Sequence, residues 1–197
     1  MKTTLLKISF IFLFLSLIGA GCEKDEELLW EISPDSETAV IQKEVDGIEF
    51  KFCLLNEEGD PATVFNEGEN FTFQFSSENK RKDTLTFDRG VIGLSEFCEV
   101  RNQVGESLGS PFIKPVLQEL IGRGAYPFQP KQVYIFEVPW IDNREAWNKW
   151  HGTFKSAKQV AMPNGKYSTK FTYLFNFGNL KTDSLTFKIN FEIRQKS

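Results

Sequence analysis

The chain has 197 residues, of which 41% are hydrophobic and 25% charged, a composition typical of one globular domain. Its formal net charge of -4 gives it little attraction for nucleic-acid backbones, and one His with three Cys offers few ligands for a metal cluster. We therefore expect no nucleic-acid partner, no bound metal and no cofactor. The clear excess is Phe, with 20 residues, and aromatic side chains favour the half-buried surface of a β-sheet.

Residues 1–21 are typical of an export signal. Lys2 and Lys7 form a positively charged start, and the apolar run from Ile8 to Ile18 is interrupted only by two serines. This run is shorter than the roughly 20 residues that a transmembrane helix needs, and small residues follow it at once. We therefore expect cleavage immediately before Cys22.

The segment from Ile18 to Cys22 resembles the lipobox of bacterial lipoproteins. The resemblance implies that Cys22 is the lipid-modified first residue of the mature chain; an ordinary signal peptide cut beside a Cys is the alternative. The acidic run from Glu23 to Glu27 resembles the signal that sends lipoproteins of one Gram-negative group to the cell surface, and the alternative is a solvated tether. We expect a lipid anchor in the outer membrane, exposure at the cell surface, a tether over residues 22–40 and one folded domain over residues 41–197.

The body of the chain alternates apolar and polar residues with a period of two, as half-buried strands do. The segment Ile48–Leu55 places Ile48, Phe50, Phe52 and Leu54 on one face. Phe71 to Ser76, Tyr167 to Phe175 and Leu185 to Arg194 alternate in the same way, and weaker strands are predicted at Leu85 to Phe87, Leu94 to Val100 and Gln132 to Val138.

These short strands, separated by turn residues and without a long amphipathic helix, predict an all-β fold. We expect an antiparallel immunoglobulin-like β-sandwich of about seven to nine strands, with a closed barrel as the alternative. The segment Pro111 to Pro130 is ambiguous, because its apolar residues suit one face of a helix while its Gly and Pro residues suit a loop. We interpret it as an excursion between strands.

Two segments of the chain resemble each other, with identical residues at several equivalent positions: Phe71 to Phe87 and Phe171 to Phe187. Each suggests a strand, a polar turn and a second strand. A duplicated half-sandwich and independent convergence both explain this. Within them, Asp83-Thr84-Leu85 and Asp183-Ser184-Leu185 resemble an O-glycosylation sequon of exported bacterial proteins, which implies modification of Thr84 and Ser184. An Asp that ends a turn before a strand is the alternative.

Two cysteines remain after Cys22, both on predicted strands of an exported chain. Cys53 and Cys98 therefore suggest a disulfide, and two free, buried thiols are the alternative. The single His151 has no catalytic motif beside it, and no spacing singles out two carboxylates of the kind that glycosidases hold about 5–10 Å apart. We expect no enzyme activity.

The segment from Pro139 to Phe154 concentrates Trp among polar residues. Trp offers a flat apolar face and one donor, which suits a sugar ring or a protein pocket, and neighbouring Asp, Asn and Arg bind hydroxyls and carboxylates. The alternative is that these Trp residues cap one end of the core. The candidate binding residues are Trp140, Asp142, Asn143, Arg144, Trp147 and Trp150.

Two further segments resemble the BsuPI-like intracellular proteinase inhibitor domains. Phe50 to Phe75 offers a strand, a polar turn from Asn56 and a second strand, and Met162 to Thr169 is similar to that family's entry to a late strand. The resemblance implies a sandwich that binds proteins. We expect a non-enzymatic surface lipoprotein that binds a protein or glycan partner, with an envelope protease inhibitor as the alternative.

Overall fold

The computed structural model describes residues 28–87, 96–113, 126–149, 152–178 and 180–196. These residues form strands and no helix that has the length and apolar character to cross a membrane. In chain order the strands are β1 (Leu28–Ile32), β2 (Val40–Val45), β3 (Ile48–Leu55), β4 (Pro61–Ala62), β5 (Val64–Asn66), β6 (Thr72–Asn79), β7 (Leu85–Phe87), β8 (Val100–Asn102), β9 (Ser107–Gly109), β10 (Phe112–Ile113), β11 (Tyr126–Phe128), β12 (Val133–Pro139), β13 (Ala146–Lys149), β14 (Gly152–Ser156), β15 (Gly165–Phe177) and β16 (Leu180–Arg194).

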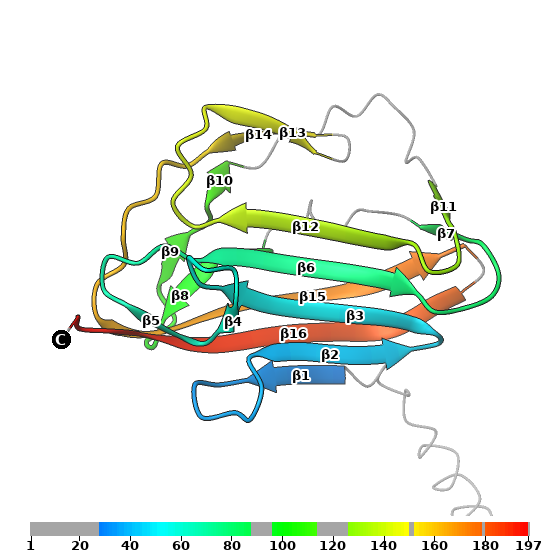
Figure 1. Cartoon of the computed structure of the whole chain (residues 1–197), viewed down its shortest axis with the longest axis horizontal. Coiled ribbons are helices and arrows are strands. Elements are labelled where there is room, and N and C mark those ends of the chain that lie inside the picture. The colour runs from blue at the N-terminus through cyan, green and yellow to red at the C-terminus, as the bar shows by residue number, and fades with distance from the viewer. Residues whose placement is uncertain (1–27, 88–95, 114–125, 150–151, 179, 197) are drawn as a thin grey trace, which may run out of the picture.

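Two main sheets form the body of the molecule. Sheet A has the order β1-β16-β15-β8-β9 with β5 beside β16, and sheet B has the order β12-β6-β3-β2 with β4 beside β3. Their strands run along the long axis of the molecule (Figure 1). Sheet C pairs β11 with β7 at one end, and sheet D, with the order β10-β14-β13, lies beyond the edge strand β12.

The all-β sandwich predicted from the alternation is confirmed. The described strands number six in sheet A and five in sheet B, more than the alternation predicted. Short strands explain the difference, because β4 has 2 residues and β5 has 3, too few to show a period in the sequence.

The predicted inner faces are the observed ones. Ile48, Phe50, Phe52 and Leu54 on β3 are all 0% exposed. The same holds for Leu185, Phe187 and Ile189 on β16, each also at 0%. Because successive strand residues point to opposite faces, an apolar residue at every second position gives a strand one apolar face. The two sheets bury these faces against each other.

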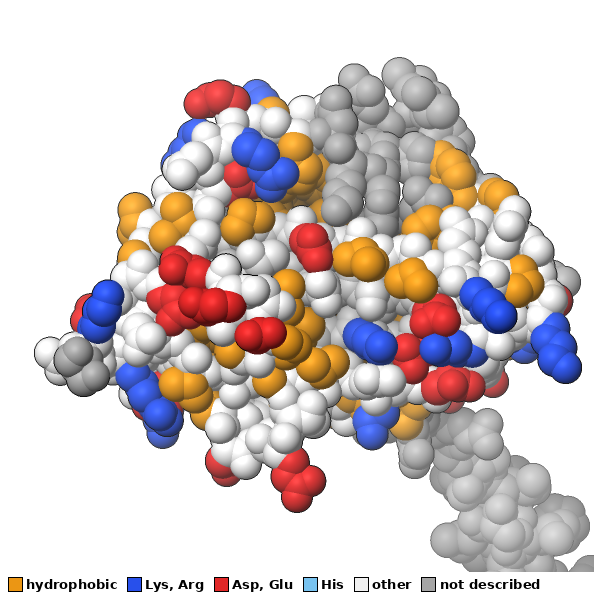
Figure 2. Space-filling model, viewed as in Figure 1, with side chains coloured by type: hydrophobic (Ala, Val, Ile, Leu, Met, Phe, Trp, Pro, Cys, Tyr) orange, Lys and Arg blue, Asp and Glu red, His pale blue; other side chains and the backbone are white. Residues whose placement is uncertain are grey.

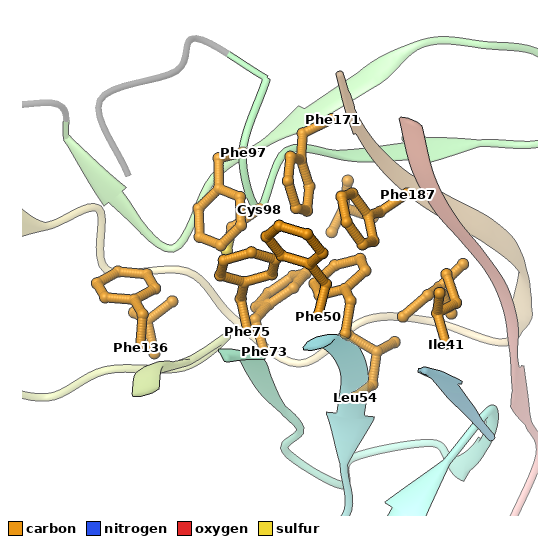
Figure 3. Close-up of a cluster of buried hydrophobic side chains, with 14 of the residues drawn as sticks. Ile41, Phe50, Leu54, Phe73, Phe75, Phe97, Cys98, Phe136, Phe171 and Phe187 are labelled. Atoms are coloured by element: carbon orange, nitrogen blue, oxygen red, sulfur yellow. The ribbon is translucent and has the colours of Figure 1, made fainter. Parts of the chain in front are cut away.

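Phenylalanine rings from the two sheets interlock between them (Figure 3). The ring centroids of Phe52 on β3 and Phe171 on β15 are 5.2 Å apart, and those of Phe75 on β6 and Phe187 on β16 are 5.6 Å apart, both edge to face. Aromatic pairs in this geometry add about 0.5–1.5 kcal/mol to what the burial of the rings contributes. These contacts hold sheet A on sheet B.

The folded domain begins before residue 41, its predicted start. Leu28–Ile32, which we assigned to the tether, forms β1 and pairs in parallel with Leu185–Ile189 of β16. Trp30 meets the ring of Phe187 edge-on at 5.1 Å. A short parallel edge strand has no local signal, because its partner lies at the other end of the chain.

A two-residue turn joins β2 to β3. Val45 pairs with Ile48, and Asp46 and Gly47 between them have φ values of 52° and 77°. Positive φ at both positions is the signature of a type I′ turn, whose twist matches that of the flanking strands. A Cβ on Gly47 would lie 2.7 Å from Cγ of Arg81, so both the backbone and the available space require glycine there.

One predicted strand differs from the structure. Residues 96–98, within the predicted strand Leu94 to Val100, form a turn, and Cys98 has a φ of 62°.

The two similar segments each form a strand, a turn and a second strand, as predicted. Their strands pair differently: Phe171 to Phe187 lies in the β15–β16 hairpin, whereas β6 and β7 of the first segment belong to different sheets. A shared local sequence therefore does not produce a repeated hairpin.

We expect Phe187→Ala to lower the free energy of unfolding by about 3–5 kcal/mol, because it leaves a cavity among rings from both sheets. Urea denaturation measures this. The control is Leu174→Ala on β15, whose side chain is 52% exposed and whose loss is expected to cost less than about 0.5 kcal/mol. Equal losses from the two variants would contradict an inter-sheet core centred on these rings.

Candidate functional site

The Trp-rich segment folds into sheet D and the chain that leads to it. β13 pairs antiparallel with β14, and Phe112 of β10 pairs with Ser156 on the other side of β14. Sheet D lies above β12 in Figure 1, on the side of the sandwich away from β1. Trp150 and His151 lie outside the described residues.

Trp140 belongs to the core. Its side chain is 2% exposed, and its ring stacks on Phe71 with centroids 6.0 Å apart and planes 7° apart. Its Nε1–H donates to the carbonyl oxygen of Val160 at 2.9 Å. With its donor and ring both used inside the protein, Trp140 presents nothing to a ligand.

Asp142 and Arg144 form a two-pronged ion pair. Nε of Arg144 donates to Oδ1 of Asp142 at 2.9 Å, and Nη2 donates to Oδ2 at 2.6 Å. Asp142 is 3% exposed, whereas the Arg144 side chain is 49% exposed. Burial alone would raise the pKa of Asp142, but the hydrogen bonds and charge of Arg144 outweigh it and hold that pKa below its usual range.

Trp147 lies half-buried between Arg144 and the core. The Arg144 guanidinium lies 4.5 Å from the centre of the Trp147 ring, and Phe154 stacks on that ring at 5.6 Å. Nε1 of Trp147 is buried without a hydrogen-bond partner among the described residues. The indole faces are therefore already in contact with protein, which leaves little of them for a sugar ring.

Further hydrogen bonds fix the chain that carries Asn143 and Arg144. Oγ of Ser156 donates to the carbonyl oxygen of Asp142 at 2.6 Å, and Nζ of Lys158 lies 3.2 Å from Oε1 of Glu145.

The predicted binding residues differ in their exposure to solvent. Asn143 is exposed. Of the predicted binding residues within the described chain, Trp140 and Asp142 are buried and Asn143 and Arg144 reach solvent, while Trp147 lies between these extremes.

The structure has free thiols rather than the suggested disulfide. Cys53 and Cys98 are both buried and unbonded. Cys53 lies on the outer face of β3 with its Sγ 3.7 Å from Oε1 of Gln74, whereas Cys98 belongs to the core between the sheets. Burial raises the pKa of Cys53 to about 11 and raises the pKa of Cys98 well above its ordinary value.

The two predicted glycosylation residues have different surroundings. Thr84 is exposed just before β7, and the Asp83 beside it pairs with Arg81 at 2.9 Å. Ser184 is half-buried within β16, opposite Leu174 of β15. Modification of both residues stays a prediction.

The outer face of sheet A has a hollow that the sequence analysis did not predict. It has a volume of about 310 Å³ and is lined by Glu96, Glu99, Arg101, Ser168, Lys170 and Lys188. These residues come from β8, β15, β16 and the turn before β8, so only the strand register brings them together. Among the described residues, no group of three His, Cys, Asp or Glu side chains is arranged to hold a metal ion.

No protein-family model matches the sequence, and no curated protein matches it either.

We expect Asp142→Asn to lower the free energy of unfolding by about 1–3 kcal/mol at neutral pH, because Arg144 loses its partner. The carboxylate stabilises the fold above its unfolded-state pKa, and this stabilisation is lost as pH falls through the lower folded-state pKa. Denaturation at several pH values should therefore show the parent and the variant converging in acid. Asp60→Asn, at an exposed position, is the control. A difference that persists unchanged in acid would contradict the ion pair.

The thiols provide a second test. In the full chain carrying Cys22→Ser, we expect a thiol reagent to leave Cys53 and Cys98 unmodified in the native state, because burial keeps both protonated. Unfolding without reductant should then release both thiols for titration. A protein that shows no thiols after unfolding would contain the disulfide instead.

Proposed function

We propose that this protein is a non-enzymatic lipoprotein of the outer membrane, exposed at the cell surface, that binds a partner protein through sheet D. The observation that supports this most directly is Arg144. Its guanidinium is half exposed, yet the buried Asp142 and the Trp147 ring hold it in one orientation. Arginine in a prearranged position is typical of residues that dominate protein interfaces, because little conformational entropy is lost on binding.

The chemistry of this surface favours a protein over a glycan. Asp142 takes Nε and Nη2 of Arg144, so Nη1 is left for a carboxylate or carbonyl of a partner. Sheet D also exposes an aliphatic side chain, since Ile113 on β10 is 58% exposed. Hydrophobic and basic side chains lie next to each other over this part of the molecule (Figure 2).

The proposed anchor leaves sheet D free to meet a partner. Cys22 precedes Leu28 of β1 by about six residues, which span at most about 20 Å when extended. The anchored end is therefore held close to the membrane, while sheet D lies on the side of the sandwich away from β1 (Figure 1). Acidic side chains gather over the loops next to β4 and β5, at the end opposite the start of β1 (Figure 2).

The experiment is capture of partner proteins from the culture medium by full-length protein in detergent, followed by affinity measurement with the purified partner. We expect Arg144→Ala to weaken binding about tenfold or more, the equivalent of about 1.4 kcal/mol. Arg144→Lys should give an intermediate loss, because an ammonium group cannot keep the two-pronged pair with Asp142.

Arg194→Ala is the matched control, because Arg194 is 58% exposed and also pairs with a carboxylate two residues away, that of Glu192. Partner binding that both Ala variants weaken equally would reflect net charge and would contradict a site at sheet D. The same protein assayed against serine and cysteine proteases tests the alternative of an inhibitor, and inhibition that is insensitive to Arg144→Ala would place that function elsewhere on the molecule.

A further inference from the structure

One cation in the hollow on the outer face of sheet A has no ion-pair partner among the described residues. Lys188 pairs with Glu31 at 3.0 Å, and Arg101 pairs with Glu99 at 3.0 Å. Lys170 is exposed and forms no ion pair with any described residue. Glu96 of the lining also forms no ion pair with any described residue, so the hollow offers one unpaired ammonium group and one unpaired carboxylate.

Two lysines occupy paired positions on β15 and β16. Lys170 of β15 lies directly opposite Lys188 of β16. Like charges at directly opposite positions destabilise a sheet, and an anion bound between them would remove that cost. Nothing in the core requires a lysine at either position, because both side chains point away from the inner face.

The rest of the lining suits hydroxyl groups. Ser168 lies opposite Arg101 of β8 and on the same face of β15 as Lys170, so it offers a hydroxyl to a ligand held at Lys170. Glu96 is exposed at the rim and can accept hydrogen bonds. A phosphate dianion would bring two negative charges near Glu96 and Glu99, whereas a ligand with one carboxylate and several hydroxyls can pair with Lys170 and donate hydrogen bonds to Glu96.

We propose that this hollow binds a sugar carboxylate, one uronic-acid unit, with its carboxylate at Lys170 and its hydroxyls on Ser168 and Glu96. A volume of about 310 Å³ lies at the lower end of small-molecule sites, which range over about 300–1,000 Å³, and fits one sugar unit. The proposal concerns sheet A alone and does not depend on a partner at sheet D. The unit reaches the site either as a free monosaccharide or as part of an acidic polysaccharide.

Calorimetric titration of the full-length protein in detergent tests the proposal. The probes are galacturonate and glucuronate, a galacturonate oligomer, glucose and acetate. We expect millimolar or tighter binding of at least one uronate and at least tenfold weaker binding of glucose and of acetate. Tighter binding of the oligomer would identify polysaccharide as the source, and equal affinity per unit would identify the free sugar; either result supports the site.

Variants separate the hollow from general attraction of anions. Lys170→Gln should weaken uronate binding at least tenfold and leave the fold as stable as before, since it removes a like-charge pair. Lys170→Arg should keep binding within about threefold. Lys43→Gln, at an exposed position of the edge strand β2, removes the same charge from sheet B and should change nothing, and Arg144→Ala should also change nothing.

Three results would overturn the proposal. The first is no saturable binding of any uronate up to about 10 mM. The second is equal binding of acetate or glucose, which would show that the hollow recognises charge alone or hydroxyls alone. The third is uronate binding that Lys170→Gln leaves unchanged.

Discussion

The whole structure depends on the packing of phenylalanine rings, edge to face, tilted and stacked, between sheets A and B. Rings from β3 and β6 meet rings from β15 and β16 at centroid distances between 4.5 and 6.3 Å. Each ring is held by neighbours on both sheets, so neither sheet can shift without separating several pairs at once. Interlocked side chains of this kind make the sandwich a rigid support for the residues on its outer surfaces.

The same chain of rings continues out of the sandwich into sheet D. Phe97 contacts Phe136 at 5.4 Å, Phe136 contacts Phe154 at 6.2 Å, and Trp147 stacks on Phe154. The aromatic residues of the Trp-rich segment are therefore used mainly to join sheet D to the core. The group that remains available to a partner is the guanidinium of Arg144, which the Trp147 ring holds in position.

The sequence was most informative where a pattern is local. A period of two identified both faces of β3 and β16, since each residue there needs only its own strand to determine which way it points. It failed where the partner is distant: β1 pairs with a strand near the end of the chain, and Lys170 faces Lys188 only through the β15–β16 register. It also left Trp140 open as a binding residue, because nothing local shows that Phe71 covers its ring.

Because the rings continue from the sandwich into sheet D, we expect the aromatic core and sheet D to unfold as one cooperative unit. Native-state hydrogen exchange on the full-length protein tests this most directly. The strand amides of Phe154 and Lys155 in β14 should open with a free energy close to that of β6 and β12, since opening sheet D also exposes the rings packed beneath it. Exchange of β14 through a separate opening of much lower free energy would contradict this cooperativity.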